Sequence, residues 1–324
     1  MIAVTGAGGF IGTALCRSLV RAGIPVREVR RAGVSPALEG LERAEIPDLE
    51  RGALTRAFAG VDVVVHLAGR AHRLRDDAGD PLTAFRRINV EGTRAVIDAA
   101  ADAGVRRVLV ASSVKAVGES TTIPWTEDTP PAPRNPYGIS KLEAERVAFT
   151  VGADRGIETV VMRFPLVYGP SAPANVLRLV ALVSRGLPLP FAGVTNRRSM
   201  LSTRNLIAAV QVLAKTPGLS GEAFFVADGV ALSTPELIQV IAAGLGRPAR
   251  LFPFPSWLLA AGGRVGDVIS RLVRFPITSA EVERLTGSLV VSTAKLTGRT
   301  SFRPPESPQE AWSEVGQWFV GRGR

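Results

Sequence analysis

Short apolar runs alternate with longer stretches of helical periodicity over the first half of the chain. Apolar runs that predict strands occupy residues 2–5, 26–30, 61–68, 106–112 and 158–164. Apolar positions at helical spacing cover residues 10–23, about 81–103 and about 137–153. The run VDVVVHLA, residues 61–68, is almost continuously apolar, as in a strand that is buried on both faces. The alternation predicts an α/β fold, a doubly wound parallel sheet with helices on both faces.

The second half of the chain is less regular. Prolines interrupt it at positions 165, 170, 173, 188, 190, 248, 253 and 255, and shorter helical patterns cover residues 206–215 and 234–245. We therefore expect a first domain of residues 1–165, to which part of residues 205–230 returns. Residues 166–204 and 231–324 are expected to form a smaller lobe, packed over the C-terminal edge of the sheet.

The glycine-rich segment TGAGGFIG joins the first predicted strand to the first predicted helix. It places Gly6, Gly9 and Gly12 three residues apart, and Phe10 and Ile11 open the helix. Glycines at this spacing allow a tight turn, close approach of a pyrophosphate, and packing of the helix on the strand. The phosphates then lie at the helix N-terminus, where backbone N–H groups are free. The context predicts a Rossmann-type dinucleotide site; a glycine-rich turn without a ligand is the alternative.

The end of the second predicted strand bears on which dinucleotide binds. An acidic side chain there usually binds the ribose hydroxyls of NAD, whereas this chain has Arg30 and Arg31. An arginine suits the 2′-phosphate of NADP, so Arg30 mildly favours NADP over NAD, although both arginines could instead point to solvent. Asp48 and Leu49 are candidates for contact with the adenine, and Asp48 could equally be a turn residue.

The segment NPYGISK places Tyr137 and Lys141 four residues apart, on one face of a predicted helix. A phenol and an ammonium in this arrangement can be a solvated pair. They can also be a general base and the cation that lowers its pKa. The rest of the sequence has to decide between these two interpretations.

Composition and charge exclude several classes of protein. The 324 residues are 46% hydrophobic and 21% charged, as in an ordinary globular protein. No apolar run reaches the length of a membrane span, and a strand follows Met1 directly, so we expect a cytoplasmic protein with no membrane partner. A single cysteine, Cys16, and two histidines make a disulfide impossible within the chain and a metal site improbable. The net charge of +10 comes from scattered arginines rather than a basic run, which argues against a nucleic-acid partner.

Six motifs follow one another along nearly the whole chain. They are TGAGGFIG, HLAG (residues 66–69), NVEGT (89–93), ASSVKAVG (111–118), PYGISK (136–141) and RFPLVYGP (163–170). Together they resemble the extended short-chain dehydrogenase/reductase family, and within it the NAD-dependent epimerase/dehydratase branch that acts on nucleotide sugars. The resemblance implies a Rossmann NAD(P)-binding domain, a nucleotide-sugar-binding lobe and hydride transfer.

The same resemblance assigns roles around the tyrosine–lysine pair. It implies that Tyr137 exchanges a proton with a sugar hydroxyl, that Lys141 holds the cofactor ribose and lowers the tyrosine pKa, and that Ser113 hydrogen-bonds the same sugar hydroxyl. Ser112 is the structural alternative to Ser113, since both lie at the end of a strand. The further cofactor-binding residues implied are Leu67, Ala68, Gly69 and Phe164. Asn89, His66 and Tyr168 are expected to be structural.

On the substrate side the resemblance points to Asn175 and to Arg198, in TNRRSM, as ligands of the phosphates or the sugar. Ser199 replaces the acid that usually follows this arginine in the family. Arg284 is a further candidate for the diphosphate on its position alone, and a surface charge on a helix is its alternative. Arginine is apt here because its planar fork binds phosphate bidentately.

Two departures from the family pattern narrow the chemistry. Dehydratases of the family carry an Asp-Glu pair after the active-site hydroxyl residue, whereas this chain has Val114 and Lys115, so dehydration is disfavoured. The role of Lys115 stays open between a phosphate, an N-acyl carbonyl and solvent. Arg30 favours a reductase that draws on NADPH, and the general pattern favours an epimerase that recycles NAD.

The resemblance is greatest to a subgroup that acts at C4 of UDP-linked N-acetylated hexoses. It implies a UDP-sugar 4-epimerase or 4-ketoreductase for surface polysaccharide synthesis, and a homodimer formed through the long helices. Two other functions stay open. The chain could be a non-catalytic dinucleotide-binding regulator, or a dehydrogenase acting on a non-nucleotide alcohol.

Overall fold

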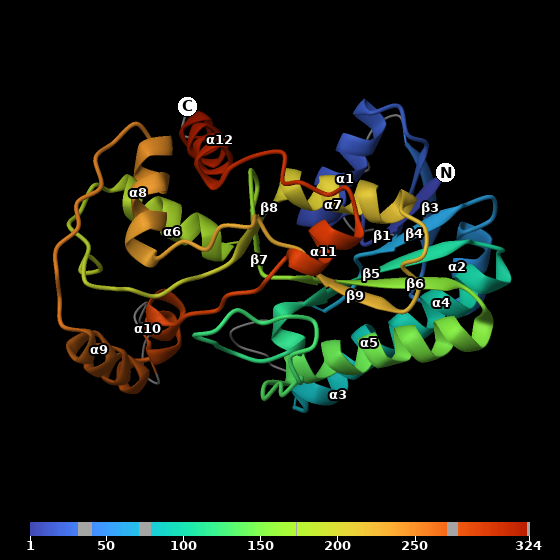
Figure 1. The fold of residues 1–324 in the computed structure, drawn as a ribbon, viewed down its shortest axis with the longest axis horizontal. Coiled ribbons are helices and arrows are strands. Elements are labelled where there is room, and N and C mark those ends of the chain that lie inside the picture. The colour runs from blue at the N-terminus through green and yellow to red at the C-terminus, as the bar shows by residue number, and fades with distance from the viewer. Residues whose placement is uncertain (32–40, 71–78, 173, 271–277, 323–324) are drawn as a thin grey trace.

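A seven-stranded parallel sheet forms the centre of the computed structural model, which describes residues 1–31, 41–70, 79–172, 174–270 and 278–322 (Figure 1). In sheet order the strands are β3 (Glu42–Ile46), β2 (Val26–Arg31), β1 (Ile2–Thr5), β4 (Val63–His66), β5 (Arg107–Ser113), β6 (Glu158–Phe164) and β9 (Glu222–Phe225). The chain winds outward from β1 in one direction and then, through β4, in the other. The carboxyl ends of β1 and β4 therefore flank the point where the strand order reverses, the usual ligand position in such sheets. The predicted doubly wound fold is confirmed.

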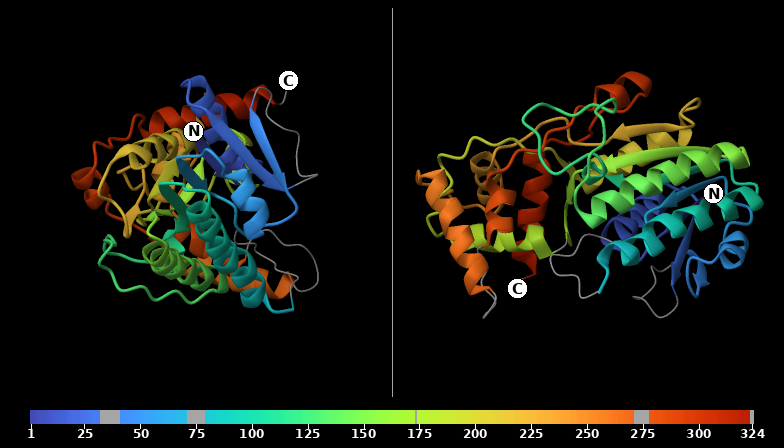
Figure 2. Two further views of the ribbon diagram at one scale, coloured as in Figure 1. Left: turned by 90° about the vertical axis from the view of Figure 1, so that its right-hand side faces the viewer. Right: turned by 90° about the horizontal axis from the view of Figure 1, so that it is seen from below.

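Helices cover both faces of this sheet (Figure 1, Figure 2). One face carries α1 (Phe10–Arg21) and α7 (Thr203–Lys215), and the other carries α2 (Arg51–Ala57), α4 (Gly92–Asp102) and α5 (Pro136–Arg155). Because successive strand residues point to opposite faces, a strand between two helical layers must be apolar at every position.

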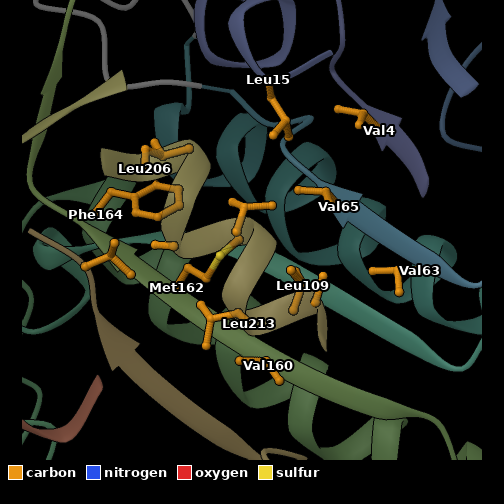
Figure 3. Close-up of a cluster of buried hydrophobic side chains, with 14 of the residues drawn as sticks. Val4, Leu15, Val63, Val65, Leu109, Val160, Met162, Phe164, Leu206 and Leu213 are labelled. Atoms are coloured by element: carbon orange, nitrogen blue, oxygen red, sulfur yellow. The ribbon is translucent and has the colours of Figure 1, made fainter. Parts of the chain in front are cut away.

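Strand β4 illustrates this requirement. Val63 and Val65 belong to the core on the α1 and α7 side, where Figure 3 shows them with Leu109 and Met162. Val64, between them, belongs to the core on the α2 and α4 side. This double burial accounts for the apolar run seen in the sequence. Cys16 is fully buried in the first of these cores, as its helical position suggests.

The helix expected over residues 81–103 is divided in three. It consists of α3 (Pro81–Arg86), a π-helical segment (Arg87–Glu91) and α4. Such local widening of a helix is frequent at functional sites because it re-aims side chains. Here it contains Asn89, which is buried below the active-site strands.

Beyond the sheet, a second group of elements packs around its own apolar cluster. A two-stranded parallel sheet pairs β7 (Leu166–Tyr168) with β8 (Met200–Ser202). The helices of this part are α6 (Ala174–Ser184), α8 (Thr234–Gly244), α9 (Ser256–Ile269), α10 (Ser279–Thr286) and α12 (Pro308–Gly321), which Figure 1 shows at the end of the molecule opposite β2 and β3. α11 (Ala294–Arg299) lies instead beside β9 (Figure 1). The predicted domain boundaries stay a prediction.

Tyr168, at the end of β7, packs against the C-terminal helix α12. Its ring stacks on Trp312 with ring centroids 4.3 Å apart and an interplanar angle of 9°. Its hydroxyl donates to the Asp228 carboxylate at 2.9 Å. Both rings are buried, so Tyr168 has the structural place that the sequence suggests.

Candidate active site

The glycine loop between β1 and α1 leaves no room for side chains. Gly6 has a φ of 71°, and a Cβ on it would lie 2.7 Å from the backbone nitrogen of Ala68. A Cβ on Gly12 would lie 2.3 Å from the carbonyl oxygen of Gly6. Gly9 is the N-cap of α1 and supplies no side-chain cap, so N–H groups of the first turn are available to an anion. The loop therefore fits the pyrophosphate of a dinucleotide.

The other predicted cofactor residues surround this loop. Phe10 and Ile11 start α1, where Phe10 packs against the smaller-lobe cluster and Ile11 against the sheet core. Leu67 is half-buried and packs against that same core, in which Phe164 is buried. The structure thus brings the loop and the ends of β4 and β6 to one edge of the sheet.

Asn89 braces the segment that follows β4. Its side-chain oxygen accepts from the Arg70 N–H at 2.8 Å, and its amide nitrogen donates to the Arg70 carbonyl at 3.2 Å and to the Ser140 hydroxyl at 3.0 Å. A Cβ on Gly69 would lie 3.1 Å from the Asn89 oxygen and 3.8 Å from Lys141 Nζ. Asn89 thus ties the predicted cofactor channel to the helix of Tyr137, the bracing role expected from the sequence.

The two serines at the end of β5 make different contacts. Ser113 forms a side-chain hydrogen bond with Tyr137. Ser112 instead donates to the buried carboxylate of Glu145, which pairs with Arg163 at 2.8 Å. Alternation along a strand explains the difference, since adjacent side chains leave on opposite faces. Ser113 is the serine placed beside the tyrosine.

The start of α5 fixes the position of Tyr137. Asn135 is the N-cap and accepts from the Gly138 N–H at 2.8 Å, while Pro136 occupies the first turn, where its missing N–H has no cost. A Cβ on Gly138 would lie 2.3 Å from the Lys115 carbonyl oxygen, so the helix start lies directly against the short turn that follows β5. Phe85 packs edge-on against the Tyr137 ring, with centroids 5.8 Å apart.

The surroundings of Tyr137 and Lys141 shift the pKa of each side chain. Burial raises the pKa of Tyr137, and the hydrogen bond from Ser113 opposes this rise. Lys141 donates from Nζ to the Ala111 carbonyl at 2.7 Å, and burial lowers its pKa to about 8 while Glu145 opposes that shift. Lys141 is not among the groups that shift the pKa of Tyr137 here, and the expected lowering of the tyrosine pKa by Lys141 stays a prediction.

His66 is a core histidine, as expected. It is buried at the end of β4, with Nδ1 2.8 Å from the Thr5 hydroxyl and Nε2 3.3 Å from the Thr93 hydroxyl. Burial, and then the charge of Lys141, lower its pKa to about 3, so the imidazole is neutral at pH 7. Within the described ranges, no three His, Cys, Asp or Glu side chains are grouped to hold a metal ion.

Two residues predicted to bind the adenosine part of the cofactor, Arg30 and Asp48, already have partners within the protein. The Arg30 side chain is 5% exposed and its guanidinium lies 3.6 Å from the carboxylate of Glu28, whereas Arg31 is exposed. Asp48 is exposed and accepts from the N–H of Leu49 at 2.8 Å, as a turn residue does. Leu49 itself packs against the core of that face.

Three cationic side chains gather near the catalytic candidates. Lys115, two residues after Ser113, has a pKa lowered by burial and further by Arg198 and Arg284, while Glu119 and Glu283 oppose the shift. Burial and Arg284 likewise lower the pKa of Arg198. Arg198 donates to the Arg284 carbonyl at 2.9 Å and to that of Gly287 at 3.2 Å.

The sequence places Arg198 and Arg284 86 residues apart, and the fold makes them neighbours. Arg284 lies on α10 and pairs with Glu281 at 4.0 Å, and its role toward a diphosphate stays a prediction. Asn175 lies in the first turn of α6. Its side chain lies outside the described part of the structure, so its predicted contact with the substrate stays a prediction.

Two supporting residues were missed by the sequence reasoning. Glu119 accepts from the Asn135 side chain and from the N–H groups of Arg134 and Asn135, at 3.2 Å each, and so holds the start of α5. Glu145 holds Ser112 and Arg163. An Asn-Pro pair is typical of a helix N-terminus, so the start of α5 could have been predicted from the sequence. The roles of the two glutamates could not, because their partners are distant in sequence.

Comparisons with known proteins agree with this arrangement. Residues 2–227 match the NAD dependent epimerase/dehydratase family. A UDP-glucose 4-epimerase of Vibrio cholerae is 34% identical over 98% of this chain and 95% of its own. An N-acetyl-alpha-D-glucosaminyl-diphospho-ditrans,octacis-undecaprenol 4-epimerase of Escherichia coli O157:H7 is 26% identical over 91% of this chain and 88% of its own.

Among solved structures, that of MoeE5 in complex with UDP-glucuronic acid and NAD is similar over 100% of this chain and 99% of its own, with 25% identity and a TM-score of 0.76. The chain therefore belongs to the NAD dependent epimerase/dehydratase family.

Proposed function

We propose that this protein is an NAD-dependent 4-epimerase of a UDP-linked sugar, of the N-acetylhexosamine type. The observation that carries the proposal concerns Lys115, whose backbone N–H donates to the Ser113 hydroxyl at 3.2 Å and whose pKa is lowered by burial and by the charges of Arg198 and Arg284. Clustered cations whose charge is partly desolvated are suited to a diphosphate, which arginine binds bidentately. A diphosphate held there leaves the attached sugar next to Tyr137.

The roles of the chain's own residues follow from their contacts. Tyr137 accepts the proton of the C4 hydroxyl, and Ser113 orients that hydroxyl and the phenol. NAD held by the glycine loop and Lys141 would supply a reversible acceptor for the C4 hydride. Lys141, at its pKa of about 8 and in reach of the channel beside Gly69, binds the cofactor ribose and favours the phenolate once it leaves the Ala111 carbonyl.

Three observations favour NAD and epimerisation over NADPH and net reduction. Arg30 is buried and ion-paired with Glu28, so its charge is already balanced within the protein. MoeE5, whose structure is similar to this one, was solved in complex with NAD. The family is itself described as NAD dependent. A UDP-sugar 4-ketoreductase is the closest alternative chemistry, and Val114 and Lys115 disfavour dehydration because neither supplies an acid.

A second candidate is a sugar joined through diphosphate to a polyprenol. The relative from Escherichia coli O157:H7 is named for such a substrate. The cation cluster would bind the diphosphate of either donor, and the exposed apolar helix α9 favours a lipid-linked one. A role in surface polysaccharide synthesis suits both candidates, and the homodimer stays a prediction.

The proposal is tested on freshly purified protein. We expect denaturation to release NAD at about one equivalent per chain, identified by mass spectrometry. We also expect purified enzyme to interconvert UDP-N-acetylglucosamine and UDP-N-acetylgalactosamine without added NADPH. An empty site that binds NADPH more tightly than NADH, with reduction of a UDP-4-keto-6-deoxy sugar, would replace the epimerase by the ketoreductase. Turnover of a polyprenyl-diphosphate sugar but not of a UDP-sugar would select the second candidate.

A further inference from the structure

The outward face of α9 is apolar, the reverse of an ordinary surface helix. Its inner face is formed by Leu259, Gly263 and Gly266, and Gly263 lies so close to α10 that a Cβ on it would be 3.0 Å from Ser279 Cα. Trp257, Ala260, Ala261, Arg264 and Val265 lie on the exposed side, with Trp257 68% and Val265 59% exposed. The helix is therefore firmly packed and still presents a large aromatic ring to solvent.

The apolar surface continues into the segment before α9. Phe252 and Phe254 are 40% and 36% exposed and their rings meet edge to face at 6.2 Å. The backbone of this segment pairs with residues 189–192, since the Phe252 N–H donates to the Leu189 carbonyl at 3.1 Å. Leu187, just before that pairing, is 54% exposed. We call Leu187, Phe252, Phe254, Trp257 and Val265 the apolar patch.

Exposed arginines lie in the same segments of the chain as the apolar patch. Arg185, Arg247, Arg250 and Arg264 are all exposed, and Arg247 donates to the Ser184 carbonyl, which joins the two segments. Within residues 247–267 the only carboxylate described is Asp267, which accepts from the Ser279 N–H at 3.0 Å and so faces α10. The segments that carry the patch are therefore positively charged, as is the chain as a whole, whose net charge is +10, whereas Glu281 and Glu283 lie on the neighbouring α10.

We propose that the apolar patch docks the protein on an anionic membrane surface. Tryptophan and phenylalanine rings favour the headgroup boundary of a bilayer, and arginines beside them add attraction to anionic lipids. A second copy of the chain fits less well, because the positively charged segments of two copies would repel each other. No helix in the described part of the chain is long and apolar enough to cross a membrane. The proposed contact is with the membrane surface, and it departs from the expectation of no membrane partner drawn from the sequence. It does not depend on which proposed substrate is turned over.

Co-flotation of the full-length protein with vesicles tests the docking. The vesicles are pure phosphatidylcholine, or phosphatidylcholine with three-tenths phosphatidylglycerol. We expect binding to the anionic vesicles that weakens several-fold in 0.5 M salt and is weak on the neutral ones. Trp257→Ser with Phe254→Ser should reduce the bound fraction roughly tenfold, since each ring carries much of the buried apolar area.

A matched control is Val20→Ser, which removes an exposed apolar side chain from α1, away from the apolar patch. It should leave flotation unchanged. Retained NAD binding and melting temperature in both variants would show that they fold. The proposal is overturned if the wild-type protein does not float with anionic vesicles, or if the double variant floats as well as the wild type. It is also overturned if the double variant instead dissociates an oligomer in sedimentation velocity, which would make the patch a contact between copies.

Discussion

The hydroxyl of Ser113 is hydrogen-bonded to the phenol of Tyr137, although the two residues lie on different elements and 24 positions apart. β5 delivers the serine, and the capped start of α5 delivers the tyrosine. The contact is present in the protein alone, so the geometry for proton exchange does not wait for substrate. The proposed proton exchange at C4 therefore takes place at this pair of hydroxyls.

Replacement of Tyr137 should remove the proton acceptor and leave the fold intact. We expect Tyr137→Phe to lower kcat by roughly two or more orders of magnitude, the usual contribution of positioned acid–base catalysis. The Phe85 contact with the ring survives this change, so NAD binding and melting temperature should stay close to those of the wild type. Near-normal turnover by the variant would show that another residue accepts the proton.

The neighbouring serines provide a matched pair. Ser113→Ala should lower kcat on the order of tenfold to a hundredfold with little loss of stability. Ser112→Ala removes a hydrogen bond to the buried Glu145 and should instead lower the free energy of unfolding by about 1.5–3 kcal/mol, with kcat largely retained. Steady-state kinetics and urea unfolding on both variants separate the two effects. The reverse pattern would assign the catalytic hydroxyl to Ser112.

The adjacent arginines test the diphosphate site. Arg198 belongs to the cation cluster, whereas Arg197 is exposed and pairs with Glu236 at 2.9 Å. Arg198→Gln should raise KM for the UDP-sugar roughly tenfold to a hundredfold, because one charge-assisted contact is lost. Arg197→Gln should change it little.

The readout specific to the diphosphate is thermal stabilisation by UDP compared with uridine. In the wild-type protein and in Arg197→Gln, UDP should stabilise much more than uridine. In Arg198→Gln, and in Lys115→Met, that difference should shrink. Equal stabilisation of the wild-type protein by UDP and uridine would argue against a diphosphate in this cluster and in favour of a non-nucleotide alcohol as substrate.

His66 should make stability depend on pH. Its pKa is about 3 in the folded protein, against an ordinary value of 6.5, so between these values the unfolded chain binds a proton that the folded protein does not. Stability is therefore lost as the pH falls through this window, by about 1.4 kcal/mol per unit.

The variant His66→Gln keeps hydrogen-bonding capacity toward Thr5 and Thr93 and cannot titrate. From pH 7.5 to pH 5.0, its free energy of unfolding should fall by about 2 kcal/mol less than that of the wild type. Urea unfolding at the two pH values measures this. If both proteins lose the same free energy, His66 is not the buried neutral group that the fold indicates.

The sequence predicted those parts of the fold that depend on local pattern. The bounds of β1 and β6 and the glycine loop follow from apolar runs and glycine spacing, and Tyr137 and Lys141 follow from a four-residue spacing and the family resemblance. β3 and β9 carry weak patterns, because both are edge strands, β3 is largely exposed and only two residues of β9 are buried. The π-helical segment at Asn89 was also missed, since nothing in a helical periodicity marks its insertion.

The electrostatics of the site were harder to foresee than its residues. The sequence identified Arg30, Arg198 and Arg284, but it could not tell that Arg30 is paired internally while the other two converge with Lys115. Likewise, the contact of Lys141 with the Ala111 carbonyl depends on how β5 lies under α5. Pairings between distant segments determine charge environments, and a single sequence does not contain them explicitly.

The most direct test of the proposed epimerase follows the hydrogen on C4. Purified enzyme, with NAD as its sole cofactor, is incubated with UDP-N-acetylglucosamine that carries deuterium at C4, and the products are examined by NMR spectroscopy. We predict UDP-N-acetylgalactosamine that retains the deuterium at C4, with no net accumulation of NADH. Loss of the deuterium to free NADH, or no conversion by enzyme that has bound NAD, would contradict epimerisation at C4 of this substrate.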